Sequence, residues 1–467
     1  MHDLPSPAPR RTTLVVGMVT LITAGAFESL AVTTAMATIA RALDGMALYS
    51  AAFAVTLATS VVGMVAAGVV TDRARPALPM LLGVGTFAAG LLVAALTPSM
   101  GLLLLGRALQ GLGQGAYVVA LYMVVARAFA PAQRARVFAW FAAAWVVPSL
   151  VGPVVAGLVV DTVGWRWVFG AVALVAAPAA AVVLTTTWRV PGPDARPGPD
   201  ATRAGLRRIG WGAVAGVGVT VVTLAAERDG AARAVGIVVG LLAALTAARS
   251  LLPRATLRGG RGLPAVVGLR GVVAAAYFST EVMLPLILQT ERGLSPTRSG
   301  TILTVAAVTW ALGSSLRGRT HLAPVTYLRV GTSLAAAGIA AAATITLPGT
   351  PLAVGWVAWA LAGLGVGLVY PTLSVLVLDV AHPAEQGAAT SALQVSDALG
   401  TSLAIALTGA AVHGVVAALG PRGYLAGFAA TTLLAALALW LTGRTTPPDD
   451  ASDGREAGTP AAGAVDA

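Results

Sequence analysis

Apolar runs of about 20 residues recur along the whole chain, and each is long enough to cross the hydrocarbon core of a bilayer, which is about 30 Å thick. Polar or Pro/Gly-rich breaks separate about fourteen such runs. Only 10% of the 467 residues are charged and 57% are hydrophobic, whereas about a quarter of an average soluble protein is charged. These charges are too few to cover several soluble domains. The sequence therefore predicts an all-α membrane protein that crosses the bilayer many times.

The polar breaks also predict the order of segments along the chain. The expected membrane-spanning helices lie at about 13–39, 49–71, 77–97, 100–126, 135–160, 167–187, 207–226, 233–252, 264–290, 297–316, 325–347, 352–379, 386–417 and 422–443. We expect six segments: a cytoplasmic N-terminal tail at 1–12, a six-helix bundle at 13–187, a cytoplasmic linker at 188–206, two inserted helices at 207–252, a second six-helix bundle at 253–443 and a disordered cytoplasmic tail at 444–467.

The charges indicate orientation rather than nucleic-acid binding. The net charge is +11, and all 30 basic residues are Arg. They stand singly or in pairs between apolar runs, without the basic stripe and interleaved aromatic residues of a nucleic-acid-binding face. With the N-terminus inside, about 22 of them fall on the cytoplasmic side and about seven outside. This bias predicts a multi-pass protein of the cytoplasmic membrane with both termini in the cytoplasm and no nucleic-acid partner.

An internal repeat predicts how the helices are arranged. The segment GLGQGAYVVALYMVVARAFAPA from Gly111 aligns without a gap with GLGVGLVYPTLSVLVLDVAHPA from Gly363, at an offset of 252 residues. Glu28 and Glu281 lie one residue from the same register. The fourth and fifth helices thus recur in the same direction as the twelfth and thirteenth, which predicts two parallel six-helix bundles with two inserted helices between them. Transporters built from parallel repeats bind substrate between the bundles and rock one against the other.

Three short motifs lie in or beside the predicted helices. GVVTDRARP follows the second helix, where its Gly would let two helices approach and its Asp could accept hydrogen bonds from a helix N-terminus. LLGRALQGLGQG lies in the fourth helix, and WVVPSLVGPVVAG predicts a kinked fifth helix with a smooth face for close packing. The motif residues, in chain order, are Gly68, Asp72, Arg73, Arg75, Arg107, Gln110, Gly111, Pro148, Gly152, Pro153 and Gly157.

Together these motifs resemble the signatures of the major facilitator superfamily, in its fourteen-helix drug:proton antiporter branch. The loop is similar to the family's cytoplasmic G-x-x-x-D-R-x-x-R signature, although Arg75 comes one residue early and is followed by Pro. The fourth-helix segment is similar to R-x-x-Q-G. The fifth-helix segment is similar to G-x-x-x-G-P-x-x-G-G, with Pro148 and Ala156 in place of two glycines. The resemblance covers about residues 13–443.

This resemblance implies a secondary active transporter of the multidrug efflux type. Such a protein exports a small lipophilic or cationic compound, such as a drug or antibiotic, in exchange for protons. The resemblance implies that the proton gradient supplies the energy without a cofactor. We expect a small-molecule substrate, protons and the lipid bilayer as partners, no bound metal, and a monomer. An importer or facilitator of a metabolite stays open as an alternative.

Acidic residues inside the spans are the candidate proton-coupling groups. An ionised carboxylate at mid-bilayer costs about 2.5–3.5 kcal/mol on insertion scales, so we expect Glu28, Glu281 and Asp397 to face an aqueous cavity or a partner. Desolvation favours the protonated acid and a nearby cation favours the ionised one, so a carboxyl that alternates between these settings can carry a proton. The resemblance places the first and fourth helices side by side, which makes Arg107 the expected charge partner of Glu28. A permanent buried ion pair that only stabilises the first bundle is the alternative.

Polar and aromatic side chains on the same helices are candidates for lining a substrate cavity, although helix packing would explain each of them equally well. They are Gln110, Gln114, Tyr117, Trp145, Tyr277, Tyr370 and Gln394.

Other classes of function lack their motifs in this chain. None of the four His forms H-E-x-x-H, and a chain without Lys cannot form a P-loop. Ser402 and His413 are about 16 Å apart along one helix, too far for a Ser–His pair. Absence of Cys excludes thiol catalysis and Cys-ligated metal. We therefore expect no enzyme, and a non-transporting receptor or scaffold would give no reason to keep acids at mid-membrane.

Overall fold

The computed structural model describes residues 8–71, 73–129, 131–188, 190, 198–226, 228, 230–320, 322–381 and 386–446. In these ranges the chain forms fourteen helices that are long and apolar enough to cross a membrane, and no β-strand. The helices are α1 (Ala8–Ala42), α2 (Tyr49–Thr71), α3 (Ala77–Leu96), α4 (Met100–Ala128), α5 (Pro131–Thr162), α6 (Arg166–Thr187), α7 (Pro199–Ala225), α8 (Gly230–Leu251), α9 (Leu263–Thr290), α10 (Pro296–Arg319), α11 (Pro324–Ala342), α12 (Leu352–Val380), α13 (Gln386–Leu419) and α14 (Tyr424–Thr442). Short 3-10 helices lie at Met46–Leu48, Thr256–Arg258, Ala343–Thr346 and Gly420–Gly423.

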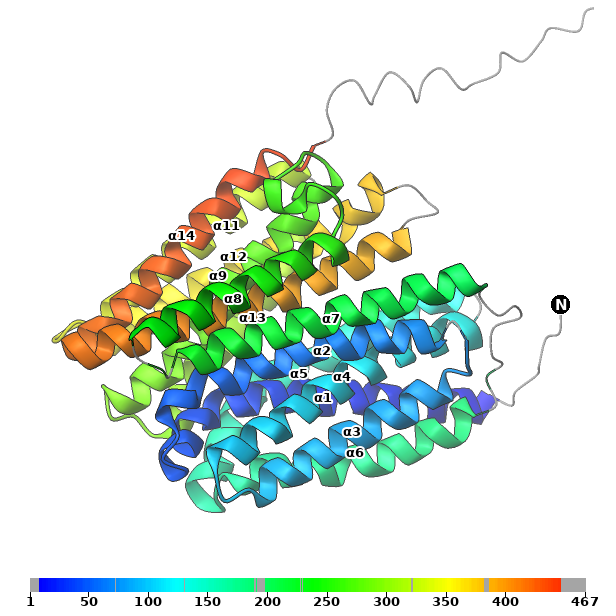
Figure 1. Cartoon of the computed structure of the whole chain (residues 1–467), viewed down its shortest axis with the longest axis horizontal. Coiled ribbons are helices and arrows are strands. Elements are labelled where there is room, and N and C mark those ends of the chain that lie inside the picture. Colours follow the sequence, from blue (N-terminus) through cyan, green and yellow to red (C-terminus); the bar gives the residue numbers. More distant parts are fainter. Residues whose placement is uncertain are drawn as a thin grey trace, which may run out of the picture.

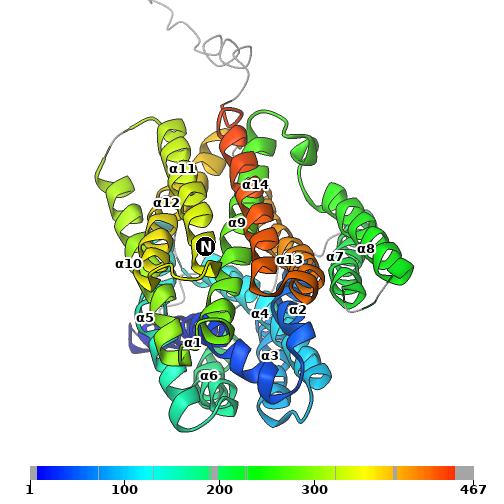
Figure 2. The ribbon, with the colours of Figure 1, turned by 90° about the vertical axis from the view of Figure 1, so that its left-hand side faces the viewer.

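Helices α1–α6 and α9–α14 form two bundles with the same internal packing (Figures 1 and 2). In the first bundle α4 packs on α2 and α3, while α1 packs on α5 and α6. The same pairs recur in the second bundle, where α12 packs on α10 and α11, and α9 packs on α13 and α14. The predicted fold class, two parallel six-helix bundles with two inserted helices, is therefore confirmed.

The inserted helices α7 and α8 pack on each other (Figure 2). Helix α7 also packs on α2 and α13, one helix from each bundle, and α8 packs on α13. Helix α7 begins at Pro199, well before the expected start at residue 207. Pro at the first helical position and an acid in the first turn, Asp200, both favour a helix start here. The Pro-rich composition around this point hides that signal, because it is also typical of a linker.

The repeated glycines explain why the repeat is visible in the sequence. A Cβ on Gly111 would lie 2.0 Å from the carbonyl oxygen of Thr56 on α2, and a Cβ on Gly363 would lie 2.4 Å from that of Ala306 on α10. No side chain fits at such distances, so glycine is required at these two positions, where α4 crosses α2 and α12 crosses α10.

The two bundles meet through α2 against α13 and α5 against α10. We call the end of the molecule where α1 begins and α14 ends the tail end, and the opposite end, where α1 is followed by α2, the far end. In Figure 1 the second bundle diverges from the first toward the tail end. At the far end Tyr49 Oη donates a hydrogen bond across the interface to the carbonyl oxygen of Val282, at 2.6 Å. The far ends of the bundles are therefore in contact.

Candidate functional site

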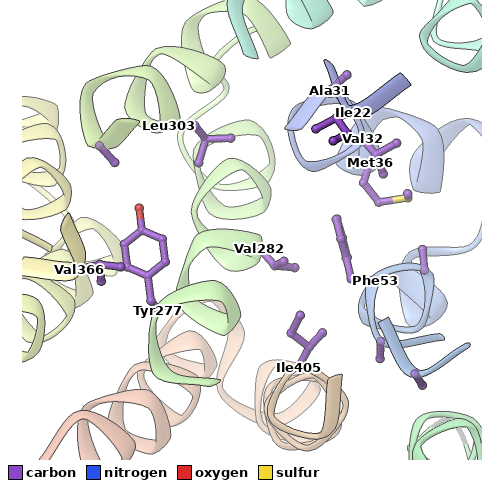
Figure 3. Close-up of a cluster of buried hydrophobic side chains, with 14 of the residues drawn as sticks. Ile22, Ala31, Val32, Met36, Phe53, Tyr277, Val282, Leu303, Val366 and Ile405 are labelled. Carbon is purple, nitrogen blue, oxygen red and sulfur yellow. The ribbon is translucent and has the colours of Figure 1, made fainter. Parts of the chain in front are cut away.

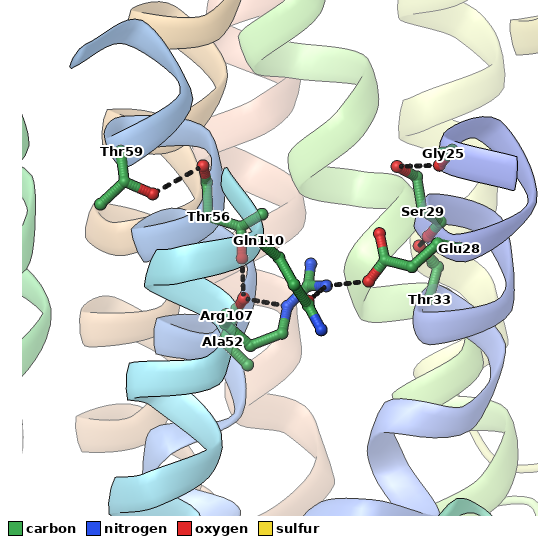
Figure 4. A network of polar contacts seen from close by, with 9 residues as sticks. All are labelled: Gly25, Glu28, Ser29, Thr33, Ala52, Thr56, Thr59, Arg107 and Gln110. Carbon is green, nitrogen blue, oxygen red and sulfur yellow. Dashed lines mark hydrogen bonds and ion pairs between the residues drawn. The ribbon is translucent and has the colours of Figure 1, made fainter. Parts of the chain in front are cut away.

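Glu28 and Arg107 form an ion pair between α1 and α4 (Figure 4). Arg107 also donates through Nη1 to Gln110 Oε1 at 2.6 Å, and through Nε to the carbonyl oxygen of Ala52 at 3.1 Å. Both charged side chains are buried, with exposed fractions of 1% for Glu28 and 4% for Arg107. The expected pairing is therefore present, and the two charges compensate each other inside the first bundle. Its part in proton coupling stays a prediction.

Gln114 and Tyr117 lie beside this ion pair. A Cβ on Gly25 would lie 2.4 Å from Tyr117 Oη and 2.9 Å from Gln114 Nε2, so both side chains reach α1 one turn before Glu28. Tyr117 is buried, and its ring lies edge-on to Phe87 at a centroid distance of 5.5 Å. The structure thus places Tyr117 in the packed interior of the first bundle, and its place in a substrate cavity stays a prediction.

Glu281 on α9 is buried, with an exposed fraction of 8%. In the part of the chain that the structure describes, no ion pair or hydrogen bond joins it to another residue. Its neighbours are aromatic. Tyr277, one turn before it, stacks on Trp359 at a centroid distance of 4.6 Å and lies edge-on to Phe278 at 5.2 Å (Figure 3 shows Tyr277). A lone carboxyl beside aromatic rings can bind a proton or an organic cation.

Asp397 has a partner that the sequence pattern did not indicate. Arg270 on α9 donates through Nε to Asp397 Oδ2 on α13 at 2.6 Å. The guanidinium carbon of Arg270 also lies 3.4 Å from the centroid of the Tyr370 ring. Arg270 lies only two turns inside α9, and it follows a loop with several arginines, so the sequence alone does not separate it from residues that set topology.

The same face of α9 carries Arg270, Tyr277 and Glu281, because positions seven and eleven residues apart are almost in register on a helix. Arg270 and Glu281 are therefore about 16 Å apart along the helix axis. The space between them holds aromatic rings, since Tyr370 lies 4.9 Å from Trp310 and 6.5 Å from Phe278 between ring centroids. This arrangement forms an aromatic region with an acid at one end and an ion pair at the other.

The loop after α2 agrees only partly with its expected structure. Asp72 lies outside the described residues. The expectation that Gly68 lets two helices approach is wrong, because a Cβ placed there would meet nothing within 4 Å. Arg73 Nη2 donates to the carbonyl oxygen of Thr202 on α7 at 3.3 Å, and Arg75 Nη1 donates to that of Trp188 at 3.3 Å. These bonds tie the loop to the start of α7 and the end of α6.

The fifth-helix motif forms the packing face that the sequence predicts. Pro148 and Pro153 lie inside α5, and they are buried together with both glycines of the motif. A Cβ on Gly152 would lie 3.6 Å from the Phe27 ring of α1, and one on Gly157 would lie 2.4 Å from the Cα of Thr297 on α10. The smooth face thus packs on α1 and on the other bundle.

Two candidate cavity residues are on exposed surfaces. Trp145 on α5 is 46% exposed, and Gln394 on α13 is also exposed. Nothing in the described structure encloses them, and their contact with substrate stays a prediction.

Comparison with known proteins finds a family whose model matches this chain. Residues 16–405 match the family model described as Major Facilitator Superfamily. A probable multidrug-efflux transporter of Mycobacterium tuberculosis is 28% identical over 80% of this chain and 83% of its own length. A methylenomycin A resistance protein of Bacillus subtilis is 26% identical over 81% of this chain and 82% of its own length.

Solved structures support the fold alone. A POT family transporter has a TM-score of 0.69 at 14% identity and covers 92% of this chain and 98% of its own. The structure of a human organic anion transporter has a TM-score of 0.60 at 16% identity, and the match covers 94% of this chain and 100% of that transporter.

Proposed function

This chain belongs to the major facilitator superfamily, is a multi-pass membrane transporter and not an enzyme, and on that premise we propose that it is a proton-coupled antiporter. In this proposal it exports a small lipophilic or cationic compound by alternating access. The names of its relatives, which refer to multidrug efflux and to methylenomycin A resistance, favour a drug or antibiotic as the cargo. The proton gradient would supply the energy without a cofactor. The protein would act as a monomer in the cytoplasmic membrane, with both termini in the cytoplasm.

The observation that supports this proposal best is the buried carboxyl of Glu281. No ion pair neutralises it among the described residues, and Tyr277 and Phe278 lie beside it. An ionised carboxylate in such a place is costly, so Glu281 is neutralised either by a proton or by a bound cation. A proton and a cationic substrate would therefore compete for one carboxyl, and this competition couples their movements in opposite directions.

The Glu28–Arg107 pair would act as a second proton site in this proposal. The pair is already neutral as a whole, so a proton that binds Glu28 leaves an uncompensated guanidinium. Bundle movement that brings Arg107 into contact with water would offset that cost. Proton binding at Glu28 would thus be linked to the state of the first bundle.

The proposal is tested by substrate uptake into inside-out membrane vesicles with an imposed pH gradient. We expect uptake that stops when the gradient is collapsed, and Glu281→Gln should abolish the dependence on the gradient. Glu291→Gln is a matched control, because it makes the same change at an exposed position at the end of the same helix. Uptake that persists equally with the gradient collapsed would contradict proton coupling.

A further inference from the structure

A hub of hydrogen bonds around Gln289, near the end of α9, joins the far ends of the two bundles. Gln289 Oε1 accepts from Thr38 Oγ1 at 3.1 Å and from Arg41 Nη2 at 3.4 Å. Its Nε2 donates to the carbonyl oxygen of Thr34 at 2.8 Å and to Ser299 Oγ at 2.9 Å. Three of these bonds reach α1 in the first bundle, and the fourth reaches α10 in its own bundle. The exposed fraction of Gln289 is only 3%.

Two further contacts close the same end of the molecule. Tyr49 Oη donates to the carbonyl oxygen of Val282, the residue after Glu281. The carboxylate of Asp161 on α5 accepts hydrogen bonds from the backbone N–H and the hydroxyl of Thr297 on α10. Gln289 therefore lies within a wider seal, and it is the one side chain of that seal described here that binds across the interface as both donor and acceptor.

The chemistry of an amide suits a contact that must break and form again. When the bundles separate at this end, the three bonds to α1 are lost together and water can replace each of them, so each bond has a modest net value and the three together hold the end closed without locking it. The amide carries no charge, and the charged side chains of this seal, Arg41 and Asp161, stay exposed, so closing the seal again buries no ion. The amide oxygen and the amide nitrogen of Gln289 can nevertheless both bond to α1 only when the two bundles are correctly aligned.

We propose that Gln289 is the latch of the far end, a positioning residue that sets how often this end opens and hence the turnover of transport. It acts through the bundle interface and not by touching the substrate. This inference rests on the alternating access that is proposed above, and it adds the residue that controls one of the two openings.

The test uses the natural absence of Cys from the chain. Val282 is buried and points from α9 toward Met36 and Phe53 of the first bundle (Figure 3), and it lies two turns deeper than Gln289 on the same face of α9. We would introduce Val282→Cys and measure its rate of reaction with a water-soluble maleimide in purified protein, where both ends meet the reagent. Gln289→Met keeps the side-chain length but removes the amide. It should raise the labelling rate by about tenfold or more, which is the factor expected for the loss of several net hydrogen bonds.

Controls separate a latch from a general loss of structure. Gln133→Met makes the same substitution at an exposed position on α5 and should leave the labelling rate unchanged. Thr38→Val removes one bond with little change of shape and should give a smaller increase, which serves as the test if Gln289→Met does not fold. In transport, the latch predicts a changed kcat with a KM close to that of the wild type.

A labelling rate equal to that of the Val282→Cys parent in both folded variants would overturn the latch. The outcome is independent of proton coupling, because labelling is measured without substrate or gradient. If transport proves independent of the pH gradient while Gln289→Met still speeds labelling, the proposed antiport fails and the latch stands.

Discussion

Glu28 and Arg107 differ in whether each can become neutral inside the bundle when its partner is removed. A carboxyl can become neutral by taking up a proton, whereas a guanidinium stays charged at any working pH. Both side chains are buried, so neither can reach water for compensation without movement of the helices. The loss of the acid should therefore be harder to tolerate than the loss of the base.

This asymmetry gives a prediction for stability. Glu28→Gln leaves a buried guanidinium without a counter-ion and should lower the free energy of unfolding by about 3–5 kcal/mol. Arg107→Met should cost less, because Glu28 can then take up a proton. The double variant should recover part of the loss seen in Glu28→Gln, since no buried charge remains. Thermal melting of the purified proteins measures the order, and a lower melting temperature for Arg107→Met than for Glu28→Gln would contradict it.

At the scale of single residues, the sequence predicts buried charged pairs better than contacts between neutral side chains. Glu28 and Arg107 stand out because ionisable residues are rare in apolar helices, and the family resemblance places their helices together. Arg270 does not stand out, because it lies close to an Arg-rich loop. Gln289 carries no charge, and its four partners come from two other helices. No local pattern indicates such a hub, since its existence depends on how the helices are placed in space.

At the scale of elements, the spacing of the repeated glycines determines which neighbour each one meets. Gly111 and Gly115, four residues apart, face α2, whereas Gly113 between them faces α3. Their counterparts Gly363 and Gly367 face α10, and Gly365 faces α11. A single G-x-G-x-G segment therefore lets one central helix pack closely on two neighbours at once, in both bundles.

These crossings give a second prediction. A Cβ on Gly115 would lie 2.1 Å from the carbonyl oxygen of Ser60, and one on Gly367 would lie 2.3 Å from that of Trp310. Both Gly115→Ala and Gly367→Ala should lower the free energy of unfolding by about 1–3 kcal/mol, because the neighbouring helix must move away. Gly85→Ala on α3 is the matched control, since nothing lies within 4 Å of its Cβ position. Equal melting temperatures for all three variants would show that these close crossings do not limit stability.

Most helix ends follow from the sequence because polar, Gly and Pro residues interrupt long apolar runs, and α2 has the expected bounds. The start of α7 does not follow, because Pro199 favours both a helix start and a linker. Tertiary contacts decide between them there, since Arg73 bonds to the backbone of Thr202 in the first turns of α7. Where local signals conflict in this way, contacts between elements set the boundary.

At the scale of the whole molecule, the repeat and the insertion constrain each other. Bundles related by a parallel repeat must begin on the same side of the membrane. An inserted pair of helices preserves that relation, whereas a single inserted helix would invert the second bundle. Helix α7 packs on α2 and α13, and α8 packs on α7 and α13. The pair thus lies against both bundles without separating them, because α2 and α13 also pack on each other. The direction of the whole assembly then depends on the arginines, which the positive-inside rule assigns to the cytoplasm.

The orientation can be tested with single thiols, because the chain has no Cys. Val163 and Leu347 are exposed at the far ends of the first and second bundles, and Leu257 is exposed at the tail end, between α8 and α9. In intact cells, a membrane-impermeant maleimide should label Val163→Cys and Leu347→Cys but should label Leu257→Cys only after the cells are permeabilised. Labelling of Leu257→Cys alone in intact cells would reverse the orientation, and labelling of only one far-end site would contradict the parallel arrangement. The three sites together thus test the direction and the parity separately, because the first depends on the charge bias and the second on the even number of inserted helices.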